Sequence, residues 1–174
     1  WVNKTTGETK LAEYNHNFDC HIIATPTKRN KTLYDYNVNM LRTTTECMSA
    51  ILGGADAVAN LAYDAIYHKD NEFGDRISRN QLLVLKHESY FDKVNNPADG
   101  AYYIETLTEQ LAEKALELFK DIEKNGGLIS QLIDGTIQRK INESAQKEQE
   151  LFDSGKEVLL GTNKYPNKND QMKN

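Results

Sequence analysis

The chain has 174 residues, of which 39% are hydrophobic and 27% charged, and 26 acidic against 21 basic side chains give it a net charge of −5. This composition is typical of one globular domain at the polar end of the range, and it excludes collagen-like and low-complexity proteins. A nucleic-acid-binding protein usually presents a basic face, so the acidic balance disfavours that class, and no apolar run approaches the roughly 20 residues of a membrane span.

The cysteine content and the first residue bear on the cellular setting. Two cysteines, Cys20 and Cys47, are too few for a disulfide framework, which predicts a reducing environment such as the cytoplasm. No signal-peptide pattern opens the sequence. The first residue is Trp1 rather than methionine, so we expect a processed fragment or a piece of a longer protein.

The first half of the chain predicts alternating strands and helices. The apolar run at residues 20–24 predicts a buried strand. Hydrophobic residues then recur every three or four positions over residues 37–52, which predicts a helix that stops at Gly53-Gly54. A second strand is expected over residues 56–61 and a second helix over residues 73–89.

The second half predicts longer helices. After a short extended segment at residues 91–94 and a turn at 95–100, the Thr-Leu-Thr-Glu sequence at 106–109 fits a capping box. In that motif the hydroxyl and the carboxylate each satisfy a free backbone N–H, so a helix is expected to begin there. Its buried stripe is expected to comprise Leu107, Leu111, Ala115, Leu118, Phe119 and Ile122, and Gly126-Gly127 is expected to end it.

The chain is expected to close with one more helix and one more strand. An amphipathic pattern predicts a helix over residues 129–152, and residues 157–161 predict a last strand. The resulting alternation is typical of a parallel α/β layer built from βαβ units. A closed (β/α)8 barrel takes about 250 residues, so this length allows either an open sheet or a portion of a barrel, and periodicity does not separate the two.

The polar clusters each allow two interpretations. The sequence Lys-Arg-Asn-Lys at residues 28–31 follows the first strand, where it could meet an anionic ligand or form a solvated loop. Residues 42–46 are expected to open a helix, where they could bind an anion or cap the helix. Arg76 and Arg79 share a helix face that is either a ligand edge or an exposed polar surface. The sequence has no phosphate-binding loop and no metal-ligand spacing of histidines or cysteines.

Four linked motifs carry a resemblance that covers most of the chain. Residues 39–46 with 50–54, residues 76–80, residues 96–108, and residues 152–155 with 161–165 resemble, in order and spacing, the late-barrel region of the methylmalonyl-CoA mutase family. The resemblance implies an α/β fold, namely the C-terminal part of a (β/α)8 TIM-type barrel with an additional C-terminal helix and strand. Residues 1–165 would form that barrel portion, and residues 166–174 a polar linker toward a possible cobalamin-binding-like domain.

The resemblance also implies an activity and a cofactor. Enzymes of this family use adenosylcobalamin to rearrange the carbon skeleton of a CoA thioester through radicals. Residues 19–24 resemble the Asp-x-His-x-x-Gly by which some cobalamin domains present a histidine to cobalt. The glycine is replaced by Ala24, and His21 falls in an apolar strand, so the preferred interpretation is a histidine at the entry of a strand.

Two segments depart from the pattern of catalytic family members. Those members typically carry Gln-Thr-Ser-Gly where this chain has Thr-Pro-Thr-Lys at residues 25–28. They also carry Gln-Ser-Leu-His-Thr-Asn in place of residues 56–61, so that the glutamine is Asp56 and the histidine is Ala59. Both segments are expected at the carboxyl ends of strands, where a barrel does its chemistry. The chain is therefore similar to the non-catalytic small subunit of the heterodimeric bacterial enzymes.

This similarity implies a structural subunit with no catalytic residue and no metal of its own. Adenosylcobalamin and the CoA thioester are expected on a large catalytic partner subunit, which interconverts methylmalonyl-CoA and succinyl-CoA in the assembled heterodimer. Neither nucleic acid nor a membrane is an expected partner. Asn39, Arg42 and Glu105 match family positions and are candidates for ligand or interface contacts.

Two other functions remain open at this point. One is a catalytically competent acyl-CoA mutase chain with an altered substrate, which would need polar groups that the Ala-Val-Ala sequence at residues 57–59 does not supply. The other is a stand-alone α/β binding protein, which would not associate with a large subunit.

Overall fold

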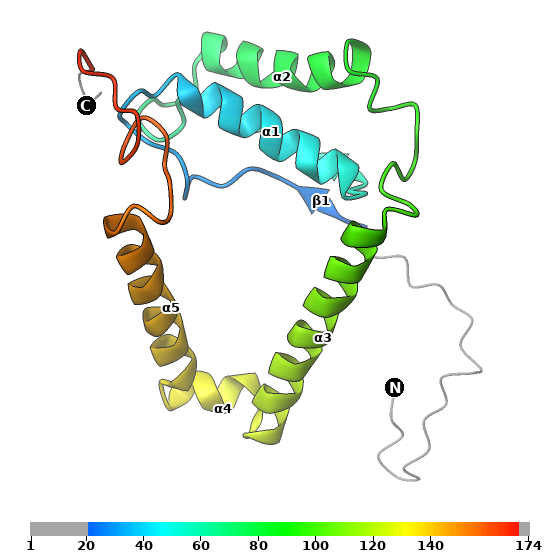
Figure 1. Ribbon diagram of the computed structural model, residues 1–174, viewed down its shortest axis with the longest axis vertical. Coiled ribbons are helices and arrows are strands. Elements are labelled where there is room, and N and C mark those ends of the chain that lie inside the picture. Colours follow the sequence, from blue (N-terminus) through cyan, green and yellow to red (C-terminus); the bar gives the residue numbers. More distant parts are fainter. Residues whose placement is uncertain (1–20, 171–174) are drawn as a thin grey trace.

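The computed structural model describes residues 21–170 and contains two short strands and five helices in that range (Figure 1). The elements, in chain order, are β1 (Ile23–Ala24), α1 (Val38–Leu52), β2 (Ala57–Val58), α2 (Glu72–His87), α3 (Tyr102–Lys124), α4 (Gly127–Ile133) and α5 (Thr136–Asp153). In the described range no helix is both long and apolar enough to span a membrane.

The strands and the first helix form one parallel βαβ unit. β1 pairs with β2 in parallel, with Ile23 opposite Ala57 and Ala24 opposite Val58. Just beyond the strands, the Ala59 amide donates to the Ala24 carbonyl at 3.0 Å. This parallel pairing across α1 confirms the predicted α/β character of the first half.

The prediction of a buried first strand is wrong for the part that the structure describes. Ile22 and Ile23 are 51% and 67% exposed. Figure 1 shows α1 and α2 on one side of β1, with the remaining helices extending on the other side. Only one face of the two-stranded sheet is therefore covered, and Cys20 lies outside the described residues.

Polar side chains fill much of the layer between α1 and α2. Gln81 of α2 donates from Nε2 to the Met40 carbonyl at 2.5 Å and to the hydroxyls of Thr43 and Thr44 at 2.9 and 2.7 Å. Its Oε1 accepts from Asn60 at 2.7 Å. Because buried polar groups are costly unless they are paired, this saturated amide links the two helices in a defined register.

A second polar cluster sets the start of α2. Asn71 caps the helix, its side-chain oxygen accepting from the Gly74 amide at 2.8 Å, while its Nδ2 donates to the buried Asp64 carboxylate at 2.7 Å. A Cβ at Gly74 would lie 2.5 Å from Asp64 Oδ1, so glycine allows this close approach. The cap explains why the predicted second helix begins where it does.

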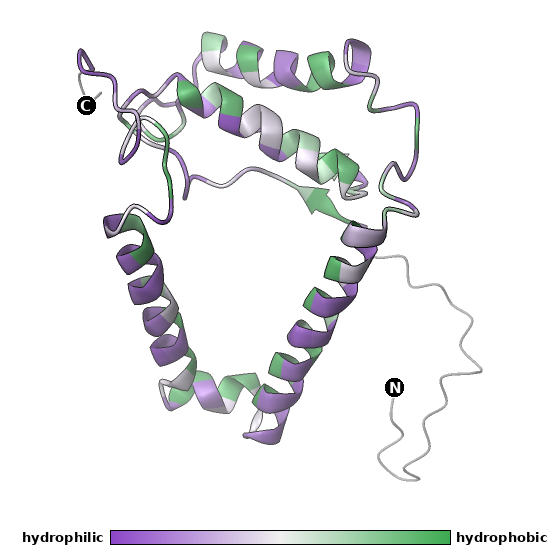
Figure 2. Cartoon of the chain, in the orientation of Figure 1, coloured by the Kyte–Doolittle hydropathy of each residue, from purple (hydrophilic) through white to green (hydrophobic). Residues whose placement is uncertain are grey.

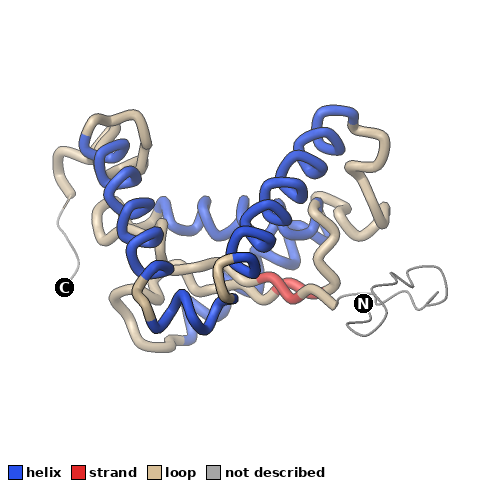
Figure 3. The backbone as a smooth tube through the Cα atoms, turned by 90° about the horizontal axis from the view of Figure 1, so that it is seen from below, coloured by secondary structure: helices blue, strands red, loops and turns tan. Residues whose placement is uncertain are grey.

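The last three helices form an arm that turns back on itself (Figure 3). Gly126 and Gly135 both have left-handed backbones, with φ of 98° and 81°, and they introduce α4 and α5. The buried Gln131 donates to the Ile122 carbonyl of α3 at 2.9 Å, and Lys140 of α5 forms an ion pair with Asp121 of α3 at 3.1 Å. These contacts fix the bend of the arm.

The predicted start of α3 is wrong. The helix begins at Tyr102, so Thr106 lies inside it, and the Thr108 hydroxyl donates to the Ile104 carbonyl at 2.8 Å. The first turn is instead closed by Glu105, whose carboxylate accepts from the Gly100 amide at 2.8 Å. The capping-box sequence therefore lies one turn inside α3. Gly100, whose φ is 72°, allows the helix to start earlier than that sequence predicts.

Four further expectations are corrected. Five of the six residues of the expected buried stripe of α3 are exposed, and the sixth, Ile122, is half-buried. The predicted helix over residues 129–152 is two helices, since the chain turns at Gly135. Residues 91–94 form turns, and residues 157–161 make only an isolated bridge, from Leu160 to Lys164, in place of a strand.

The interface between α1 and α2 is tested by replacing its central amide. Gln81→Ala would leave buried partners unpaired, so we expect it to lower the free energy of unfolding by about 1–3 kcal/mol, measured by urea denaturation. Gln149→Ala is the matched control because Gln149 bonds only to exposed Asp153 on α5, and its effect should stay within about 0.5 kcal/mol. Equal effects of the two substitutions would contradict this account of the interface.

Candidate functional site

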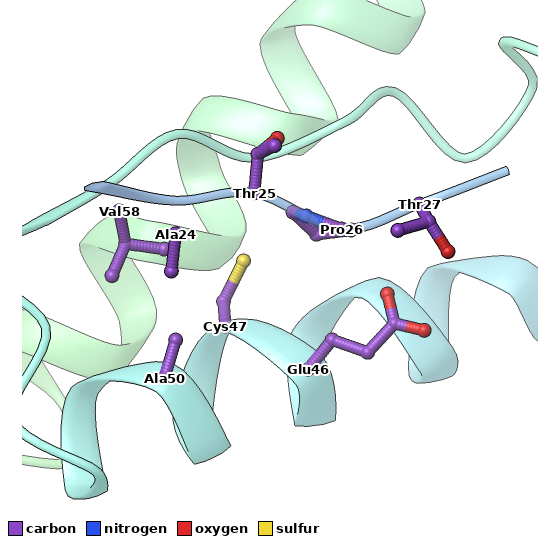
Figure 4. Close-up of a pocket in the computed structure, with 8 residues that line it drawn as sticks. All are labelled: Ala24, Thr25, Pro26, Thr27, Glu46, Cys47, Ala50 and Val58. Atoms are coloured by element: carbon purple, nitrogen blue, oxygen red, sulfur yellow. The ribbon is translucent and has the colours of Figure 1, made fainter. Parts of the chain in front are cut away.

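The carboxyl ends of β1 and β2 are where a parallel α/β fold places its binding groups. A cavity of about 220 Å³ lies beside this edge, between β1 and α1 (Figure 4). Its walls are formed by Ala24, Thr25, Pro26, Thr27, Glu46, Cys47, Ala50 and Val58. Apart from Glu46 and Cys47, these residues carry no ionisable side chain.

The acidic group of the cavity is already paired. Both carboxylate oxygens of Glu46 accept from Lys31 Nζ at 2.8 Å, and Asn30 donates to the same carboxylate at 2.5 Å. The Lys31 side chain is only 1% exposed, so this ion pair is part of the interior. The ion pair between Lys31 and Glu46 holds the loop after β1 against α1.

These pairs bear on the predicted anion site at residues 28–31. Lys31 bonds to Glu46, and Arg29 forms an ion pair with Glu148 of α5. Two of the three cations in the cluster thus have carboxylate partners from distant helices. The cluster joins the β1–α1 loop to α1 and α5, which supports neither an anion site nor a simple solvated loop.

The thiol of the cavity is held in its neutral form. Cys47 is fully buried, and this burial raises the pKa of its thiol to about 11, with the Glu46 carboxylate acting in the same direction and Lys31 opposing both. Figure 4 shows its sulfur directed toward the strand segment above α1. A thiol that stays protonated at neutral pH is a poor nucleophile, so it packs as a small apolar group.

Two of the three sequence candidates, Asn39 and Arg42, are brought into contact. Arg42 donates from one guanidinium nitrogen to Asn39 Oδ1 at 2.8 Å and from the other to the Leu160 carbonyl at 2.6 Å. Burial lowers the pKa of Arg42 from its ordinary value, while the carboxylates of Asp35 and Glu46 act in the opposite direction. Arg42 thereby ties the chain after α5 to the start of α1.

Asn39 itself is completely buried and fully hydrogen-bonded. Its Oδ1 also accepts from the Thr32 amide at 3.2 Å, and its Nδ2 donates to the carbonyls of Thr32 and Tyr63 at 2.9 and 3.2 Å. An asparagine side chain has two donor hydrogens and one acceptor oxygen with two lone pairs, and all four are used here. The amide joins α1 to the loops that follow β1 and β2.

The third candidate, Glu105, lies apart from the other two. It is at the start of α3 beside a second cavity, of about 440 Å³, between the end of α1 and the start of α3. The walls of that cavity also include Leu52, Gly53, Ile104 and Thr108. Its carboxylate accepts from the Gly100 amide, so its observed contact belongs to the start of the helix.

The two segments that depart from the catalytic pattern lie at different places. Residues 25–28 follow β1, at the carboxyl edge as expected. Asp56 instead precedes β2, and its carboxylate accepts from the Ile22 amide at 2.7 Å, so its expected position is wrong. Ala59 does follow β2 at the carboxyl edge, where its methyl group offers neither a donor nor an acceptor.

The structure also shows where the remaining polar candidates lie, namely residues 42–46, Arg76 and Arg79. Residues 42–46 do not open a helix, because α1 already begins at Val38; the hydroxyls of Thr43 and Thr44 donate back to carbonyls of the preceding turn. Arg76 and Arg79 are exposed on α2.

Sequence reasoning missed the buried carboxylate of Asp64. Asp64 is 2% exposed, and its Oδ2 lies 3.1 Å from His68 Nδ1 and 2.7 Å from Asn71 Nδ2. The i,i+4 spacing of Asp64 and His68, with an asparagine ahead of the second helix, was the available signal. Across residues 21–170 no group of three or more acidic, histidine or cysteine side chains is arranged to hold a metal ion.

The fold and site together define an α/β protein whose polar groups at the strand edge are engaged in holding its own loops. Comparison with known proteins agrees with the sequence motifs: the family model for methylmalonyl-CoA mutase matches residues 5–174. The chain belongs to the methylmalonyl-CoA mutase family, which confirms the resemblance seen in the sequence.

Some of the similar relatives are named as small subunits of the enzyme, and others are named methylmalonyl-CoA mutase without mention of a subunit. The chain is 44% identical over 147 residues to the methylmalonyl-CoA mutase small subunit of Porphyromonas gingivalis, covering 84% of this chain and 24% of the relative. It is 35% identical over 146 residues to the small subunit of Streptomyces virginiae (84% and 23%). It is 40% identical over 136 residues to methylmalonyl-CoA mutase of Rhizobium meliloti (78% and 19%). The chain thus spans about a quarter or less of the length of these relatives.

The family is cobalamin-dependent. His21 has Asp56 3.6 Å from its Nδ1, but its side chain is 70% exposed and it lines neither cavity. His68 is directed to the buried Asp64. The cavity beside β1 is small, and its polar groups are paired or neutral. The described residues of this part of the chain therefore do not fit a cobalamin site.

The neutral state of Cys47 predicts a pH dependence of stability. Its pKa is about 11 in the folded protein, above the unfolded value of about 8.5. The folded state therefore holds the thiol proton more tightly, and this contribution is fully present below the unfolded pKa and is lost as the pH rises toward about 11. The stability difference between wild type and Cys47→Ala, measured by denaturation, should shrink over that range. A difference that stays constant would contradict the assignment.

Proposed function

We propose that this chain is part of the small subunit of an adenosylcobalamin-dependent methylmalonyl-CoA mutase, and that it serves as scaffold for the assembled enzyme. The assembly would interconvert methylmalonyl-CoA and succinyl-CoA, which makes the chain a component of an isomerase. Adenosylcobalamin and the CoA thioester would be bound by a large catalytic subunit in a heterodimer. Similarity to two relatives named as small subunits supports this proposal.

The observation that carries the proposal is the saturation of the polar groups at the strand edge. Asn39 uses all its hydrogen-bonding capacity on neighbouring segments, and Arg42 is engaged on both sides. Ala59 presents only a methyl group at the end of β2, and Cys47 is neutral. Groups that are committed in this way hold loops in place, whereas catalysis requires free groups aimed at a substrate.

The domain assignment is part of the same proposal. Residues 1–165 would be the C-terminal portion of a (β/α)8 barrel, and residues 166–174 a linker toward a cobalamin-binding-like domain. The parallel β1–α1–β2 unit supports this, because it is the repeating unit from which such a barrel is built. Asn39 and Arg42 would then hold the loops in place, Glu105 would be a candidate for a ligand or interface contact, and the assembly would work in the cytoplasm.

Two alternatives make different predictions. A competent acyl-CoA mutase chain would bind adenosylcobalamin and turn over substrate without a partner. A stand-alone α/β binding protein would not associate with a large subunit.

The test uses the full-length small subunit and a purified large subunit. We expect the two to co-elute in size-exclusion chromatography and to turn over methylmalonyl-CoA with adenosylcobalamin, whereas the small subunit alone shows neither cofactor binding nor turnover. Turnover by the small subunit alone would establish the first alternative. Failure to co-elute with the large subunit would favour the second.

A further inference from the structure

Two exposed residues, Asn125 and Gly126, join α3 to α4. α3 ends at Lys124 and α4 begins at Gly127, so neither residue belongs to a helix. Figure 2 shows the last turns of α3 coloured mainly as hydrophilic, so the junction lies in a polar part of the chain. Asn125 is also the single asparagine of the sequence that precedes a glycine. The junction therefore places a side-chain amide directly before a backbone nitrogen whose residue has no side chain.

The fold itself requires glycine after Asn125. Gly126 has φ of 98°, in the left-handed region that residues with a Cβ disfavour. A Cβ at this position would lie 3.3 Å from the Ser130 hydroxyl oxygen, which is closer than ordinary van der Waals contact. The Gly126 amide donates a long hydrogen bond of 3.3 Å to the Glu123 carbonyl. Because this residue has no Cβ and its nitrogen is only weakly held, the nitrogen is open to approach by the preceding side chain.

We propose that Asn125 is a site of spontaneous deamidation through a cyclic imide. The Gly126 nitrogen forms a bond to Cγ of Asn125 and loses its proton, while the Cγ–Nδ2 bond breaks and ammonia leaves with that proton. Water then opens the imide ring at one of its two carbonyl carbons. Opening at Cγ leaves aspartate in an ordinary peptide, and opening at the backbone carbon leaves isoaspartate. The attacking and attacked atoms belong to adjacent residues, so the reaction is intramolecular and consumes only water.

The modification changes the contacts that hold the end of α3. Asn125 Nδ2 donates to the carbonyl and to carboxylate Oδ1 of Asp121, at 2.7 and 3.0 Å. A carboxylate at position 125 has no hydrogen to donate and faces these oxygens as a like charge. Negative charge is also unfavourable at the C-terminus of a helix. Asp121 pairs with Lys140 of α5 at 3.1 Å, so the new charge competes for the cation that joins α3 to α5.

The reaction is tested by incubating the folded chain at mildly alkaline pH and following its peptides by mass spectrometry. Asn95 is the matched control, because it is exposed and outside any helix like Asn125 but is followed by Asn96. We expect Asn125 to convert about tenfold or more faster than Asn95, since its intramolecular nucleophile is unhindered. Both aspartate and isoaspartate should form.

Two results would overturn the proposed modification. Equal conversion of Asn125 and Asn95 would show that the junction does not favour the reaction. Aspartate without isoaspartate would show direct hydrolysis of the side chain in place of the imide route. Neither readout involves a partner subunit or turnover.

The effect on the arm is tested separately with Asn125→Asp, which carries the charge of the product. We expect the amides of α4 to exchange with deuterium about threefold faster in this variant, because one unfavourable charge lies at a helix end. Asn95→Asp adds the same charge outside the helices and should leave exchange in α4 unchanged. Exchange in α4 that is the same in Asn125→Asp and in the wild type would contradict the loosening of the junction.

Discussion

The buried side-chain amide of Asn39 is the interaction on which the β1–α1–β2 unit of this chain depends. It joins α1 to the segments that follow β1 and β2, because it bonds to the backbone of Thr32, to the Tyr63 carbonyl and to Arg42 on its own helix. A two-residue strand pair contributes little by itself. The position of α1 relative to both loops is therefore set by this amide more than by the sheet.

Other contacts extend the same arrangement outward. Arg42 donates a hydrogen bond to the Leu160 carbonyl, and the Thr162 hydroxyl donates to the Thr32 hydroxyl at 2.9 Å. The chain after α5 is thus held over the start of α1. Gln81 adds α2 through a second saturated amide. Polar side chains that specify geometry in this way have no remaining capacity for a substrate, which is why scaffold and catalysis separate in the proposed heterodimer.

The sequence was most informative where local chemistry decides the structure. The period of three and four residues and Gly53-Gly54 predicted α1 almost to the residue, since a helix with one buried face and a glycine stop needs little else. The start of α3 was misplaced because Gly100 and Glu105 allow an earlier start than the capping-box residues suggest. The apolar stripe of α3 follows the predicted spacing, but no residue of α3 is buried in the described part of the chain. Asn39 and Arg42 were found through the family pattern, whereas only the coordinates show that each bonds to the other and to separate loops.

The most direct measurement of this account is native-state hydrogen exchange at the Thr32 amide, which donates to Asn39 Oδ1 at 3.2 Å. If this contact holds the two loops to α1, the Thr32 amide can exchange only when α1 itself opens, so its opening free energy should equal that of amides in the middle of α1. An opening free energy near zero at Thr32, like that of the exposed turns at residues 91–94, would contradict the central role of Asn39.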